Sequence, residues 1–235
     1  MATKTVTNVN SPTLDTTNKK FGSASMLVTV ADGLSIANDT DFDMGSGDFT
    51  VEWFIYPTNN STNGICGQAL FSTDICYFIS SYGFGAPGAY FGIGNSAGTG
   101  FDYATPSANA ISINNWHHTA MVRSGTNVYG YIDGTRSTLL TGYSSALRVS
   151  SNPFLIGAQQ GGANGVIGNI DEVRISKGIA RYTAATITVP TAEFTTDANT
   201  VLLMHFNSSP FVDESVASAG VTVLPTPQLL TLGCG

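Results

Sequence analysis

Two adjacent carboxylates, Asp171 and Glu172, lie in the segment GNIDEVRIS, residues 168–176, of a chain in which charged residues are sparse. Paired carboxylates can act as the general acid and the nucleophile of a glycoside hydrolase. The segment has the pattern of a β-strand, however, and successive side chains of a strand point to opposite faces. Asp171 and Glu172 therefore cannot flank one substrate atom, and we exclude a catalytic dyad there.

A second group of oxygen ligands is the aspartate series Asp39, Asp41 and Asp43. Hard cations such as calcium prefer several oxygens close together. The series departs from the helix-loop-helix calcium template, because Gly45 comes one place late and Thr50 stands where a bidentate glutamate is needed. We expect no cofactor, and calcium held by these three aspartates is the alternative.

The three histidines are His117, His118 and His205. A Ser-His-Asp arrangement needs a nucleophile on an exposed elbow, and the chain contains no G-x-S-x-G motif. No two histidines have a metal-binding spacing. We interpret His117 and His118 as strand residues bonded to backbone, and His205 as a core or edge residue.

Aromatic rings alternate with glycines over residues 80–103, SSYGFGAPGAYFGIGNSAGTGFDY. Rings with sparse polar groups suit sugars and protein partners, although such rings also fill cores. The candidates for glycan contact are Tyr82, Phe84 and Tyr103.

The composition limits the partners. A formal net charge of −7, with pI near 4.6, offers no basic surface for nucleic acid. No stretch approaches eighteen consecutive apolar residues, so we expect no membrane span, and residues 1–15 lack the apolar region of a signal peptide. Cys66, Cys76 and Cys234 fit neither a disulfide framework nor a zinc spacing. We expect reduced, buried thiols, with a Cys66–Cys76 link across a hairpin as the alternative.

The elements that must position these residues are short strands. Period-two patterns, separated by Gly, Asn, Ser and Pro clusters, predict strands at residues 49–56, 116–123, 128–132, 135–140, 154–157, 166–176 and 201–206. Asp133-Gly134 between two such patterns predicts a tight hairpin. Only residues 177–185 look briefly helical. The pattern predicts an all-β fold, a two-sheet antiparallel jelly-roll sandwich with N- and C-terminal arms.

We divide the chain into an N-terminal arm at residues 1–20, a sandwich at 21–206, and a C-terminal strand and apolar arm at 207–235. Residues 217–235 carry no charge and contain two prolines. Such an arm needs a surface to lie on. Its expected partner-binding residues are Val221, Val223, Leu224, Leu229, Leu230 and Leu232.

Six segments in order resemble the concanavalin A-like, laminin-G-type jelly rolls. They are KFGSASM (20–26), LSIANDTDFDMGSGDFTVEWFIYP (34–57), NWHHTAMVR (115–123), VYGYIDG (128–134), FLIGA (154–158) and GNIDEVRIS. The resemblance implies that residues 39–48 form a turn and that Asp171 and Glu172 are structural, one carboxylate accepting loop-amide or arginine hydrogen bonds and the other facing a rim. Related glucanases use a Glu-x-Asp-x-Glu strand, which this chain lacks, so we predict no catalytic residues and no enzyme.

The segment that follows, from Gly178 to Ser215, is similar to the version of this domain common in bacteriophage structural proteins. The resemblance implies a non-enzymatic virion protein, assembled in the host cytoplasm. Our first hypothesis is a capsid decoration or cement protein that binds the major capsid protein or other virion proteins as a homo-oligomer, a trimer by analogy. The alternative is a carbohydrate-binding, lectin-like module or a tail appendage protein that contacts host glycans.

Overall fold

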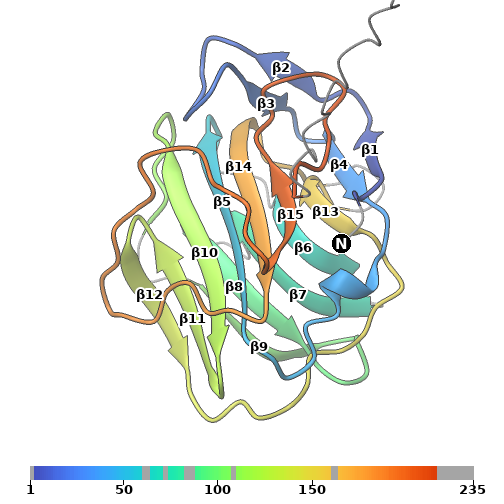
Figure 1. Ribbon diagram of the computed structural model, residues 1–235, viewed down its shortest axis with the longest axis vertical. Coiled ribbons are helices and arrows are strands. Elements are labelled where there is room, and N and C mark those ends of the chain that lie inside the picture. Colours follow the sequence, from blue (N-terminus) through green and yellow to red (C-terminus); the bar gives the residue numbers. More distant parts are fainter. Residues whose placement is uncertain are drawn as a thin grey trace, which may run out of the picture.

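The computed structural model describes residues 3–59, 64–70, 74–81, 88–106, 110–159 and 164–215. Their strands form two antiparallel sheets packed face to face (Figure 1). One sheet has the order β1 (Val6–Val9), β4 (Gly33–Ile36), β13 (Phe154–Gly157), β6 (Ile65–Leu70), β7 (Asp74–Ser81), β8 (Ala89–Gly94) and β9 (Phe101–Pro106). The other has the order β12 (Thr135–Leu140), β11 (Asn127–Ile132), β10 (His117–Ser124), β5 (Phe49–Pro57), β14 (Gly168–Lys177), β3 (Ser25–Val28) and β2 (Thr13–Asp15), and β15 (Thr200–Met204) also pairs with β14. The predicted jelly-roll sandwich is confirmed.

The core lies between the sheets and follows the period-two pattern. On β5, Phe49, Val51, Trp53 and Ile55 are buried in the main hydrophobic cluster. The opposite face of the same strand is also buried, with Phe54 in a separate cluster on the outer side of the sheet. Burial on both faces explains why this strand reads as an almost continuous apolar run.

The predicted hairpin between β11 and β12 is confirmed. Asp133 and Gly134 have φ angles of 48° and 78°, and Ile132 pairs with Thr135 directly across the turn. A two-residue turn of this hand needs positive φ at both central positions, which Asp-Gly tolerates.

The N-terminal residues are built into the sandwich. β1 pairs with β4 at the edge of the seven-stranded sheet, and β2 pairs with β3 at the edge of the eight-stranded sheet. At the other end of the chain, β15 lies beside β14. Residues 3–20 therefore contribute an edge strand to each sheet of their own domain.

Residues 178–199 connect β14 to β15 along the chain, and we call them the strap. The strap crosses the outer face of the eight-stranded sheet (Figure 1). The helix expected at residues 177–185 is wrong: β14 continues to Lys177, and the strap beyond it is an irregular, extended segment. The reason is tertiary, because apolar side chains of the strap pack on apolar residues that point out of the sheet. Those of the strap are Ala180, Tyr182, Ile187, Val189 and Phe194.

A buried charged network lies beneath the strap. Glu52 on β5 is fully buried and accepts hydrogen bonds from Arg174, His118 and Tyr182. Burial alone raises the pKa of Glu52, but the hydrogen bond from His118 and the charge of Arg174 lower it by more, so the net pKa is lowered. The network gives the strap a polar anchor as well as an apolar one.

Cys66 and Cys76 are free thiols in the core. Burial raises the pKa of both, that of Cys76 to about 12. Because the two cysteines are not bonded to each other, the alternative of a Cys66–Cys76 link is wrong. Cys234 lies outside the described residues. Within those residues, no helix is long and apolar enough to cross a membrane.

Candidate functional site

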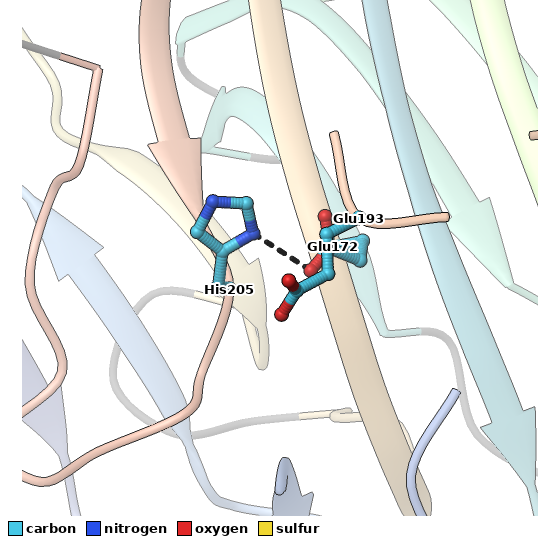
Figure 2. A group of neighbouring side chains, drawn as sticks. All are labelled: Glu172, Glu193 and His205. Carbon is cyan, nitrogen blue, oxygen red and sulfur yellow. Dashed lines mark hydrogen bonds and ion pairs between the residues drawn. The ribbon is translucent and has the colours of Figure 1, made fainter. Parts of the chain in front are cut away.

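Three potential metal ligands converge where β14, the strap and the chain after β15 meet (Figure 2). They are Glu172, Glu193 and His205, and one ligand atom from each lies within 4.8 Å of the others. Nδ1 of His205 is 2.7 Å from Oε1 of Glu172. Glu172 is buried, His205 half-buried and Glu193 exposed, so the cluster opens to solvent on one side.

Backbone geometry places Glu172 in this cluster. The register between β14 and β5 shifts between Asp171 and Arg174, and Glu172 has φ of 52°, in the left-handed region. The extra residue of this bulge breaks the alternation of faces. The expectation that Asp171 and Glu172 point to opposite faces is therefore wrong, since both contact segments that pack with Phe54 on the outer face of the sheet. Asp171 then accepts hydrogen bonds from the amides of Lys20 and Phe21.

The structural interpretation of Asp171 is thus supported by its loop-amide hydrogen bonds. Burial raises the pKa of Asp171, and the hydrogen bonds from these amides lower it because they favour the charged form. Burial has the larger effect, so the net pKa is raised to about 7. Glu172, in contrast, is fully buried and does not face an exposed rim. Sequence reasoning missed the cluster, since its members come from three segments and only the bulge points Glu172 toward the others.

His117 lies between a serine and an aspartate. Its Nδ1 is 2.6 Å from Oδ2 of Asp133, and its Nε2 is 2.9 Å from Oγ of Ser112. The hydrogen-bonded series Ser112, His117 and Asp133 resembles a serine hydrolase triad. Nε2 also accepts the backbone N–H of Ser112 at 3.1 Å, so the ring closes the turn that precedes β10. The expected backbone bond is present at His117, whereas His118 bonds to Glu52 instead.

Two of the three calcium candidates contact a lysine. Nζ of Lys4 is 2.5 Å from Oδ2 of Asp41 and 3.6 Å from Oδ2 of Asp39. Asp39 caps the 3-10 helix η1 (Thr40–Phe42) by accepting the amide of Asp41. An ammonium group thus already lies between two of the three candidate carboxylates.

The aromatic segment divides between the core and the outer face of the seven-stranded sheet. Phe91 belongs to the main core. Phe78 and Tyr90 pack on the outer face with Ala69 and Ile75. Phe101 is 39% exposed, and its ring centroid lies 5.9 Å from that of Phe78.

A glycine makes room for this arrangement. A Cβ at Gly92 would lie 2.2 Å from the Phe78 ring, so the ring lies across the backbone of β8. Among the predicted glycan contacts, Tyr82 and Phe84 lie outside the described residues, and the backbone of Tyr103 pairs with Ile93. The predicted partner-binding residues at positions 221–232 also lie outside the described residues.

The family model of the concanavalin A-like lectin/glucanases superfamily matches residues 29–188. The chain belongs to this superfamily, as its fold indicates. No curated protein matches the sequence.

Several solved structures share the fold. Domain 4 of AbnA, a GH43 extracellular arabinanase from Geobacillus stearothermophilus in complex with arabinotriose, matches with a TM-score of 0.56 at 18% identity, over 75% of this chain and 83% of that chain. The CBM40 of a Ruminococcus gnavus IT-sialidase, bound to α2,3-sialyllactose, matches with a TM-score of 0.50 at 13% identity, over 67% of this chain and 91% of that one. Full-length tailspike protein 2 from an Escherichia coli O157:H7 bacteriophage matches with a TM-score of 0.53 at 12% identity, over 88% of this chain and 30% of that chain.

Proposed function

We propose that the protein is a non-catalytic, lectin-like domain that binds glycans on the outer face of its seven-stranded sheet, as part of a phage appendage. Among the hypotheses from the sequence, the comparisons favour this alternative over capsid decoration. Two similar domains are bound to arabinotriose and sialyllactose, and a third belongs to a tailspike.

The observation that carries the proposal is the difference between the two outer faces. The outer face of the eight-stranded sheet is covered by the strap, whose residues pack on Phe54 and Tyr131. On the outer side of the seven-stranded sheet Phe78 is buried, but Tyr90 is half-buried and Phe101 is 39% exposed. A sugar ring presents apolar C–H faces, which pack against aromatic rings of this kind.

Phe101 is the contact residue that the geometry favours. Its ring is partly exposed while Phe78, beside it, is buried and holds it in place. Fixed polar groups bond to the turn that precedes Phe101: Arg148 donates from Nε to Asp74 and from Nη1 to the carbonyl of Ser96, between β8 and β9. An exposed ring that follows such a turn supplies apolar area for affinity, and sugar sites add a few polar groups for orientation.

A glycan array tests the proposal. The full chain should bind a defined set of glycans, and Phe101→Ala should weaken that binding at least tenfold, about 1.4 kcal/mol. The matched control is Leu27→Ala, because Leu27 on the other sheet is also 39% exposed. Equal binding by the Phe101→Ala and Leu27→Ala variants would show that Phe101 is not part of the glycan site. Absence of binding by the wild type to any glycan would reject the proposed function.

Capsid decoration remains the second candidate. The observation that favours it is the uncharged, apolar segment at residues 217–235, which suits burial against a shell protein. Particle incorporation of a truncated chain tests it, as described in the Discussion.

A further inference from the structure

We propose that Glu172, Glu193 and His205 form a binding site for a divalent transition metal of the zinc class. The ligand atoms would be Nδ1 of His205 and one carboxylate oxygen from each glutamate, which already point toward one another (Figure 2). The site is distinct from the glycan face, because it lies at the junction of β14 with the strap.

The distances suit such an ion. Nitrogen and oxygen ligands lie about 2.0–2.2 Å from zinc, so two ligand atoms of a tetrahedral site are roughly 3.4 Å apart. In the cluster the closest pair, Nδ1 of His205 and Oε1 of Glu172, is 2.7 Å apart, and all three ligand atoms lie within 4.8 Å. Binding would replace the hydrogen bond between Nδ1 of His205 and Oε1 of Glu172, so these two atoms would move apart by roughly 0.7 Å and the exposed Glu193 would move toward the ion.

Neighbouring groups orient the two carboxylates. The amide of Phe194 donates to Oε2 of Glu172 at 2.6 Å, which leaves Oε1 directed at His205. The side-chain amide of Asn207 donates to Oε1 of Glu193 at 2.7 Å, and Oδ1 of the same residue accepts from the amide of Ser23. Hydrogen bonds from outside the ligand set are what fix metal ligands in position and tune their basicity.

The ligand types select the metal. Calcium takes six to eight oxygen ligands, whereas zinc accepts both imidazole nitrogen and carboxylate oxygen, and three protein ligands leave a fourth tetrahedral position open. Two carboxylates also match the charge of a dication. A bound ion would tie together three segments that are distant in sequence: β14, the strap and the chain after β15.

The experiment uses the full chain, stripped with a chelator and titrated with zinc chloride, while heat of binding and melting temperature are recorded. We expect one zinc per chain and a rise in melting temperature of at least about 2 °C, because an ion that binds only the folded state stabilises it. Calcium and magnesium chloride at the same concentrations should leave the melting temperature unchanged.

The decisive variant is Glu193→Gln, which removes a ligand at an exposed position. It should weaken zinc binding at least tenfold, whereas Glu214→Gln should bind as the wild type does. Glu214 is a matched control, since it is a glutamate near His205 that lies outside the ligand group.

Cobalt substitution separates this site from the thiols. A cobalt complex with visible bands but no thiolate charge-transfer band supports nitrogen and oxygen ligands. A thiolate band, zinc binding unaffected by Glu193→Gln, or no zinc effect on the wild type would each overturn the proposal. None of these results depends on glycan binding, which Phe101→Ala tests separately.

Discussion

The phenol of Tyr182 on the strap donates a 2.8 Å hydrogen bond to the fully buried carboxylate of Glu52 on β5. The two residues are 130 positions apart in the sequence. This bond connects the strap to the charged network of the eight-stranded sheet, and it adds a polar anchor to the apolar packing that holds the strap on the sheet.

Tyr182→Phe should destabilise the protein by about 1–3 kcal/mol, because a buried acceptor loses a donor that water cannot replace. Urea unfolding measures the change. Tyr143→Phe is the control: its hydroxyl bonds to the exposed Asp102, so its effect should stay within about 0.5 kcal/mol. Equal effects of the two substitutions would contradict the anchoring role of Tyr182.

Asp32 should contribute to the loss of stability in acid. Burial raises its pKa, but the Thr29 hydroxyl and the amides of Ser11 and Thr29 lower it by more, so the net pKa is lowered. A lowered pKa stabilises the folded state above the unfolded value of about 3.9, and this contribution is lost as the pH falls through the folded pKa. Asp32→Asn should therefore flatten the fall in unfolding free energy below about pH 4, as urea titrations at several pH values would show. If the unfolding free energy of Asp32→Asn fell with pH as steeply as that of the wild type, Asp32 would not contribute to the loss of stability in acid.

Ser112 should not react with a fluorophosphonate probe, despite its bond to His117. In serine hydrolases the amide of the nucleophile helps to bind the oxyanion, but the amide of Ser112 already donates to Nε2 of His117. Gel fluorescence beside an active serine protease is the measurement. Labelling that disappears in Ser112→Ala would reveal an enzyme and contradict the proposed function.

Calcium should leave the melting temperature unchanged, because the ammonium of Lys4 lies between Asp39 and Asp41. Replacing an internal ion pair by a bound cation would require Lys4 to move away. Thermal unfolding in calcium and in chelator is the measurement. A calcium-dependent rise that is lost in Asp41→Asn would restore these residues as calcium ligands.

Deleting residues 217–235 should leave the sandwich folded and, if the protein decorates a capsid, abolish its incorporation into particles. Apolar burial contributes about 25 cal/mol per Å², so an arm covering several hundred Å² would supply much of the attachment. Circular dichroism checks the fold, and sedimentation with particles measures incorporation. Leu229→Ser combined with Leu230→Ser should reproduce the loss without shortening the chain, and full incorporation of either variant would reject the arm's role.

Patterns of neighbouring residues predicted the strands with clear apolar alternation and the turn with a characteristic residue pair. The alternation of residues 49–56 predicted β5, and Asp133-Gly134 predicted the turn between β11 and β12, because both depend on neighbours in sequence. The sequence patterns did not predict β1 to β4 or β6 to β9. Their patterns are shorter or interrupted by glycines such as Gly67 and Gly92, which are required for the close approach of Phe78.

The positions of the candidate site residues depended on the tertiary structure more than the strands did. Tyr90 and Phe101 stood in the aromatic segment, but only strand register separated them from Phe91 in the core. The placement of Lys4 beside Asp41 could not be predicted, because nothing in residues 1–20 indicates that the first strand pairs beside the turn at residues 39–43.

The sequence by itself determined the class of fold and family membership, since period-two alternation, turn residues and ordered segments are properties of neighbouring positions. Only the tertiary structure decided that Glu172, Glu193 and His205 meet. A bulge reverses the face on which Glu172 would otherwise lie, and the strap carries Glu193 back over the sheet. Contacts of this kind depend on how distant segments pack, and no local pattern encodes them.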